Sequence, residues 1–152
     1  MSKLLPNLIP PFRYATVEEG LFRGGYPKSR NLRFMKRLRL KTVLSLIPDA
    51  LIPEAQSFCQ HHHINMLHIK VDKMKEDNIP LSYNKTLMAL QIIIDPANHP
   101  LYIHCLDGAD VTGLVIACLR KLQMWSTSSA MSEFSRYIIL MHFFMVARID
   151  HL

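Results

Sequence analysis

The chemistry-bearing segment of the chain is the run from His104 to Gly113, where a cysteine is followed by a tight loop. It reads His-Cys-Leu-Asp-Gly-Ala-Asp-Val-Thr-Gly, after the short apolar stretch Leu101–His104. Backbone N–H groups in such a loop point inward, and the helix that follows adds a positive partial charge at its N-terminus. A cysteine held there has a depressed pKa and can attack phosphorus as a thiolate. The pattern predicts an anion-binding cup with Cys105 as nucleophile.

Three neighbours of the cysteine have predicted roles in this cup. Gly108 permits the backbone dihedrals that a tight loop needs. Thr112 is placed to donate its hydroxyl to the sulfur. His104 either helps to hold the thiolate or is a buried, hydrogen-bonded histidine, and the residue types leave both interpretations open.

The segments around this loop alternate between strand and helix patterns. Apolar, β-branched stretches predict strands at Val17–Arg23, Thr42–Ile47, Ile64–Val71 and Leu101–His104. Helical periodicity and capping residues predict helices from Ser29 to about Leu38, Pro53 to about His62, Leu81 to Ile94 and about Thr112 to Gln123, with a last helix starting at Ser126 or Ser128. This alternation predicts an α/β fold with a central, mostly parallel sheet flanked by helices on both faces.

The length of 152 residues fits one domain, residues 1–152. Residues 1–15 are proline-rich and predict an extended N-terminal arm. The apolar segment 137–152 is a buried closing helix, a partner surface or an alternative end to a longer product. The longest apolar stretch of the whole chain, Tyr137 to Ala147, is far short of the roughly 17–25 residues needed to span a bilayer, so no membrane span is expected.

The loop resembles the H-C-x-x-G-x-x-R-T-G motif of the cysteine-dependent tyrosine and dual-specificity phosphatases. More narrowly, the chain resembles the plant and fungal atypical dual-specificity phosphatases, whose active members cleave inositol pyrophosphates. The likeness covers roughly residues 10–137 and includes the segments Val17–Pro27, Leu38–Val43, Asn98–Cys105 and Cys118–Ser126. The resemblance implies a cysteine-phosphatase fold, no cofactor and a phosphocysteine intermediate on Cys105.

The chain departs from this motif six residues after Cys105, where the resemblance implies arginine and the sequence has Val111. An arginine grips two phosphate oxygens and stabilises the charge of the transition state, which valine cannot do. Losing a neutral charge stabiliser costs roughly 10²–10³ in rate, and a phosphoryl-transfer arginine can contribute roughly 10³–10⁵. Asp107 and Asp110 add like charges, each costing roughly 1–4 kcal/mol at about 4 Å from an anion.

The phosphate-type loop therefore comprises His104, Cys105, Leu106, Asp107, Gly108, Ala109, Asp110 and Val111. The altered residues predict a pseudophosphatase that acts by binding a related phosphatase, another protein or an anion. The alternative is an active phosphatase for phosphotyrosine or an inositol pyrophosphate. That alternative needs another cation, for which Arg23 is the candidate, although Arg23 could equally pair with a carboxylate.

A general acid is the remaining catalytic requirement. In the resembled fold it is an aspartate on a loop over the pocket. Asp72, Glu76 and Asp77 lie in the corresponding stretch, with Asp72 as the candidate, and a solvated loop is the alternative.

The formal net charge is +6, and its distribution is uneven. Between Gly20 and Pro48 there are eight basic residues and no acidic one: Arg23, Lys28, Arg30, Arg33, Lys36, Arg37, Arg39 and Lys41. Such a block favours an anionic partner or is a solvated helix face. No recognised nucleic-acid motif accompanies it, so nucleic acid is not an expected partner.

The histidines and cysteines of the chain bear on metal binding and on the redox state of its environment. His61, His62 and His63 are consecutive on a helix end, so they cannot all face one ion, and no metal site is predicted. The three cysteines, Cys59, Cys105 and Cys118, are an odd number without a secretory leader, which predicts a reduced, cytoplasmic protein.

Overall fold

The structure, a computed structural model, describes residues 7–75 and 78–136. These residues form one mixed sheet whose strand order is β1-β2-β5-β3-β4. The strands are β1 (Ala15–Glu18), β2 (Leu21–Gly24), β3 (Thr42–Ser45), β4 (Asn65–His68) and β5 (Leu101–His104). The β1–β2 pair is antiparallel and the other three pairs are parallel, which confirms the mostly parallel sheet.

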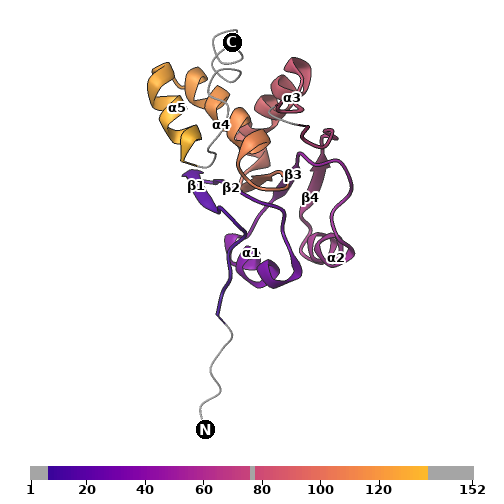
Figure 1. The fold of residues 1–152 in the computed structure, drawn as a ribbon. Helices are drawn as coiled ribbons and strands as arrows, with labels where there is room; N and C mark the ends of the chain where they lie inside the picture. The colour runs from indigo at the N-terminus through magenta and orange to yellow at the C-terminus, as the bar shows by residue number, and fades with distance from the viewer. Residues whose placement is uncertain (1–6, 76–77, 137–152) are drawn as a thin grey trace.

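Helices cover both faces of this sheet (Figure 1). They are α1 (Leu32–Leu38), α2 (Pro53–His61), α3 (Tyr83–Ile94), α4 (Asp110–Leu122) and α5 (Thr127–Ser135). In Figure 1, α1 and α2 lie below the sheet and α3, α4 and α5 lie above it. The two buried clusters follow this division, since Val43 packs with the α1–α2 side and its neighbour Leu44 with the α3–α5 side. Successive strand residues point to opposite faces, so a strand buried on both sides is apolar throughout.

The central strand β5 carries the cysteine to the edge of the sheet. It pairs with β2 and β3 in parallel, and all four of its residues are buried. Cys105 follows directly, at the carboxyl end of the strand. In open α/β sheets this edge is where ligands bind, because loops there are flanked by helix N-termini.

Two predicted elements differ in the structure. The predicted strand Val17–Arg23 is two antiparallel strands, because Gly20 adopts φ +79° and turns the chain between them. The helix expected from Ser29 is a 3-10 turn over Ser29–Asn31 followed by α1, and Asn31 Oδ1 accepts the Lys28 N–H across that turn at 2.9 Å. The asparagine side chain, rather than that of Ser29, stabilises this turn.

The described part of the predicted N-terminal arm, residues 7–14, contains no helix and runs along the molecule as far as β1. Asn31 Nδ2 donates to the carbonyls of Ile9 and Pro10, each at 3.1 Å, and Gly25 N–H donates to Phe12 O at 2.8 Å. The prediction for residues 137–152 lies outside the described residues. Within the described ranges, no helix is long and apolar enough to cross a membrane.

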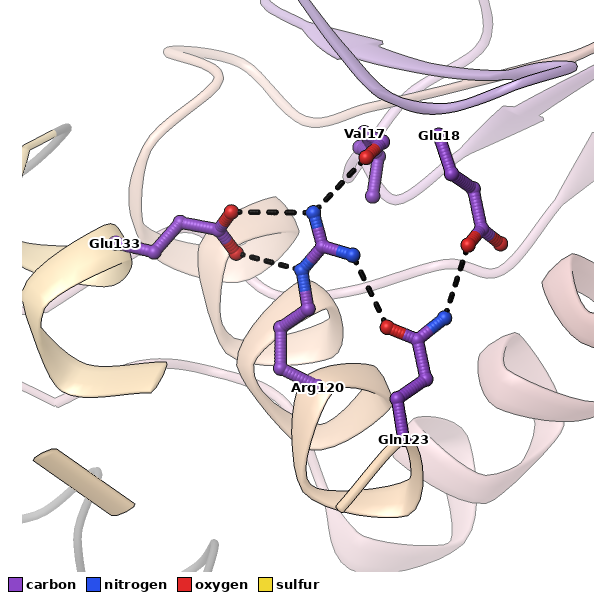
Figure 2. A network of polar contacts seen from close by, with 5 residues as sticks. All are labelled: Val17, Glu18, Arg120, Gln123 and Glu133. Atoms are coloured by element: carbon purple, nitrogen blue, oxygen red, sulfur yellow. Dashed lines mark hydrogen bonds and ion pairs between the residues drawn. The ribbon is translucent and has the colours of Figure 1, made fainter. Parts of the chain in front are cut away.

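A polar network anchors α4 against β1 and α5 (Figure 2). Arg120 donates to both carboxylate oxygens of Glu133, at 3.1 and 3.2 Å, and to the carbonyl of Val17 at 2.9 Å. Its third nitrogen donates to Gln123 Oε1 at 3.0 Å, and Gln123 donates in turn to Glu18 at 2.9 Å. Because α4 begins at the cysteine loop, this planar, fully used guanidinium helps to fix the direction of the helix that supports the site.

Candidate active site

A small cavity opens directly over Cys105. Its volume is about 120 Å³. The residues that line it are mostly apolar and come from both sides of the loop: Leu46, Pro48, Val71, Asp72, Met74, Pro80, Cys105, Leu106, Asp107, Asp110 and Val111. Among the described residues, no lysine, arginine or histidine lines it, whereas three carboxyl groups do. The electrostatics of this cavity therefore disfavour a phosphate dianion.

The Asp107 carboxylate occupies the loop that sequence reasoning assigned to phosphate. Its Oδ1 accepts the Ala109 N–H at 2.9 Å and the Asp110 N–H at 3.4 Å. The same oxygen accepts the Cys105 thiol at 3.3 Å. These are donors that a bound anion would use, so the chain supplies its own anion in the cup. The interaction also explains why α4 begins at Asp110 rather than at the predicted Thr112, since a carboxylate that accepts N–H groups at a helix start stabilises that start.

The environment of Cys105 favours the neutral thiol. The residue is 2% exposed. Burial and the negative charge of Asp107 raise the pKa of Cys105 above its usual value, and the opposing effect of Thr112 does not offset them. A nucleophilic cysteine needs the reverse, a depressed pKa near a positive charge. The geometry therefore keeps Cys105 protonated at neutral pH.

Asp107 and Asp110 titrate as a pair. Burial opposes ionisation of Asp107, but hydrogen bonds from Ala109 N–H, the Asp110 carboxyl and the Cys105 thiol outweigh it and lower the pKa of Asp107. For Asp110, burial and the adjacent Asp107 carboxylate raise the pKa to about 6. The charge on Asp107 is thus the persistent one, and Asp110 gains a proton in mildly acidic conditions.

His104 is a buried, hydrogen-bonded histidine. Its Nδ1 lies 3.1 Å from the carbonyl of Cys105 and its Nε2 lies 2.6 Å from Ser45 Oγ. A carbonyl oxygen only accepts, so Nδ1 carries the hydrogen and Nε2 accepts the Ser45 hydroxyl. Burial lowers the pKa of His104 to about 4. The neutral ring therefore gives no positive charge to a thiolate at Cys105, and of the two interpretations the structure supports the structural one.

Gly108 and Arg23 fix the backbone of the loop on the side that packs against β2 and Gly25. Gly108 has φ +76°, and a Cβ there would lie 2.6 Å from Gly25 N, which excludes any side chain. Arg23 is 2% exposed and donates from a terminal nitrogen to Gly108 O at 3.2 Å. The guanidinium thus holds the loop backbone and is not among the residues lining the cavity. In this geometry Arg23 does not supply the cation expected of the active alternative.

Thr112 and Asp72, the remaining predicted catalytic residues, lie near the sulfur in different ways. Thr112 is fully buried, and its hydroxyl has no hydrogen bond of good geometry within the described residues, although its proximity lowers the pKa of Cys105. We therefore regard it as a weak contact with the sulfur. Asp72 lines the same cavity as Cys105. The other two candidates, Glu76 and Asp77, lie outside the described residues.

Arg13 is a site residue that sequence reasoning did not identify. Its guanidinium donates to the backbone carbonyl of Asp107 at 2.9 Å, and its charge lowers the pKa of Asp110, against the larger effects that raise it. The two residues are 94 positions apart, and no motif connects them. The contact arises because the N-terminal arm passes beside Gly25, which itself lies against the loop.

The chain is similar to known phosphatases over most of its length. The model of the tyrosine phosphatase family matches residues 8–144. The chain belongs to the tyrosine phosphatase family. This tyrosine phosphatase family member is 40% identical over 131 residues to the rice protein inositol diphosphatase DSP1, covering 86% of the chain and 59% of that relative. It is 33% identical to inositol diphosphatase DSP4 of Arabidopsis thaliana, covering 85% of the chain and 65% of that relative.

A solved structure shares the fold of this family member at higher coverage. The core catalytic domain of the Saccharomyces cerevisiae PP-IP phosphatase SIW14, in complex with citrate, superposes with a TM-score of 0.85 at 32% identity. That alignment covers 95% of the present chain and 87% of the solved domain. The fold is therefore a cysteine-phosphatase fold, as the sequence predicted. The chain spans about 60% of the length of the curated relatives named above. The activities of those full-length proteins are therefore not assigned to this chain.

Proposed function

We propose that this member of the tyrosine phosphatase family is a pseudophosphatase that acts by binding rather than by turnover. The observation that supports this most is the Asp107 carboxylate, which accepts the Cys105 thiol and N–H groups of the loop that resembles a phosphate-binding loop. Val111 lines the cavity at the position where resemblance to the family implies arginine. A cup with carboxylates and apolar walls suits a cationic or apolar group of a protein partner better than a phosphate dianion. A related phosphatase or another protein is the proposed partner.

The proposal predicts very low hydrolysis of p-nitrophenyl phosphate and of an inositol pyrophosphate by the purified protein. Losing a phosphoryl-transfer arginine alone corresponds to roughly 10³–10⁵ in rate. The Cys105→Ser variant is the matched control, since it removes the nucleophile with one atom changed. Turnover that disappears in Cys105→Ser would refute the proposal.

An active phosphatase with a Cys105 phosphocysteine intermediate is the second candidate. Its support is Asp72, a carboxyl group that lines the same cavity as Cys105, together with the inositol diphosphatases among the relatives. The same assay with an added Asp72→Asn variant separates the candidates. Activity that is lost in both Cys105→Ser and Asp72→Asn, with a change in pH profile for the second, would favour this candidate.

A gain-of-binding experiment tests whether the cup is an intact scaffold. Combining Val111→Arg with Asp110→His supplies a guanidinium and removes a carboxylate. We expect inorganic phosphate or vanadate to bind this double variant at least tenfold more tightly than the natural chain. No change in affinity would indicate that the loop backbone itself cannot accept phosphate.

A cytoplasmic location is part of the same proposal. It is supported by the three cysteines, Cys59, Cys105 and Cys118, all of which are buried and none of which is in a disulfide.

A further inference from the structure

A second cavity lies on the opposite side of the sheet from α4, between the carboxyl ends of α1 and α2. Its volume is about 360 Å³. The lining divides into an apolar part, Met35, Leu40, Phe58 and Ile64, and a basic part, Lys36, Arg39 and His62. Figure 1 shows α1 and α2 together on this face, with α3, α4 and α5 on the other, so the cavity is separate from the cysteine loop.

The charge at this cavity is not compensated by nearby acidic residues. The segments 20–48 and 55–71, which contribute α1, β3, β4 and nearly all of α2, contain no aspartate or glutamate. Glu54 is in the first turn of α2, whereas the cavity is at the last turn. In the part of the chain that the structure describes, Lys36 and Arg39 form no ion pair. Both side chains are exposed, and His62 is half-buried beside them.

The titration of His62 is consistent with a positive local field. Burial and then the charges of His61, Lys36 and His63 lower the pKa of His62 below its usual value. Basic residues at helix C-termini are common because they interact favourably with the helix dipole. That effect explains individual residues such as Lys36 and Arg37 in the last turn of α1. The dipole effect does not explain why basic residues at the ends of two helices line one cavity whose other lining residues are apolar.

We propose that this cavity binds an organic polyphosphate, with phosphate oxygens on Lys36, Arg39 and His62 and a ring or short apolar group on the floor formed around Phe58. Arg39 is the C-cap of α1 at φ +50° and lines the cavity together with Lys36 from the last turn of that helix. Arginine and lysine are the usual phosphate-binding side chains, the first through a planar fork and the second as a point charge. This site is independent of Cys105 and does not depend on whether the cysteine loop is active. The polyphosphate is either a free small molecule or a lipid headgroup.

The test uses the whole chain and three probes: ATP, tripolyphosphate and vesicles containing phosphatidylinositol 4,5-bisphosphate. We expect ATP to bind more tightly than tripolyphosphate, because only ATP places a ring on the apolar floor. The Lys36→Gln/Arg39→Asn variant removes two lining charges, and asparagine tolerates the left-handed backbone at position 39. We expect this variant to lose at least tenfold in affinity for ATP, and binding by the natural chain to weaken steeply with salt.

The matched control is Arg30→Gln/Arg37→Gln, which removes the same charge from the same basic block without touching the cavity lining. We expect this control and Cys105→Ser to bind ATP within about twofold of the natural chain. Amide and His62 chemical shifts in NMR should change at the cavity on titration. Stronger binding to vesicles than to ATP would assign the polyphosphate to a lipid, and the reverse would assign it to a free molecule; either supports the site.

Three results would overturn the proposal. An equal loss of ATP affinity in the Arg30→Gln/Arg37→Gln control would show that ATP is attracted to a diffuse positive surface. A loss of ATP affinity in Cys105→Ser, or NMR shift changes confined to residues 104–111, would place the anion in the cysteine loop. If ATP, tripolyphosphate and the vesicles all fail to bind at millimolar probe concentrations, the cavity has no such ligand.

Discussion

The Asp107→Asn variant should lower the pKa of the Cys105 thiol. Asp107 Oδ1 lies 3.3 Å from the sulfur, and its negative charge is one of the causes that raise the thiol pKa. Asparagine retains an oxygen that can accept the Ala109 N–H, so the loop keeps its hydrogen bond while the charge disappears. The substitution therefore isolates the electrostatic effect from the structural one.

The size of the effect follows from Coulomb's law. Two like unit charges at about 4 Å repel by about 1 to 4 kcal/mol, depending on whether the surroundings resemble water or a protein surface. Since one pKa unit is about 1.4 kcal/mol, the range is about one to three units. Asp107 is half-buried, so solvent screening favours the lower part of the range. We expect a decrease of about one to two units, or roughly ten to a hundred times more thiolate at pH 7.

The assay is an NMR pH titration of the Cys105 Cβ carbon, chosen because the buried sulfur reacts slowly with alkylating reagents. Glu19→Gln is the matched control, because it removes one exposed carboxylate between β1 and β2, at the end of β2 opposite the Gly24–His104 pair. The control should leave the thiol pKa unchanged. A thiol pKa that stays the same or rises in Asp107→Asn, with the loop amide shifts preserved, would refute the electrostatic account of this site.

Further predictions concern the supports of the loop. Gly108→Ala places a Cβ 2.6 Å from Gly25 N on a residue with φ +76°. This variant should lower the free energy of unfolding by about 2 kcal/mol or more in urea titrations. An unchanged urea midpoint would contradict this loop geometry. Burial lowers the pKa of His104 to about 4, so between about pH 6.5 and pH 4 the histidine is protonated in the unfolded chain but neutral in the folded one. The free energy of unfolding should therefore fall as the pH decreases through this range, by at most about 3 kcal/mol for this group. His104→Asn should remove that component, and identical pH dependence in both proteins would show that it is absent. Arg120→Met should lower the free energy of unfolding by about 2–4 kcal/mol in the same titrations, since it leaves the Glu133 carboxylate without its bidentate partner. Arg120→Lys should recover less than half of that loss, because lysine cannot bind both carboxylate oxygens through a planar fork. Full recovery would contradict the planar geometry.

The cysteine loop could be recognised from the sequence because its chemistry is local. A His-Cys pair after an apolar strand, a glycine three residues later and a Thr-Gly pair at a helix start specify a tight cup by residue type alone. The alternation of strands and helices likewise predicted the mostly parallel sheet. The break at Gly20 was missed because a single glycine within a strand pattern does not distinguish a bulge from a full turn.

Tertiary structure decided the electrostatics of that loop. The sequence showed that Asp107 and Asp110 were present, but not that Asp107 folds back onto the loop N–H groups and the thiol, because that depends on side-chain geometry. It also could not direct Arg23 to the carbonyl of Gly108 rather than to the cavity, since β2 and the loop are 85 residues apart and meet only through the pairing of β2 with β5. Local sequence therefore determined the shape of the cup, whereas long-range packing determined which charges face it.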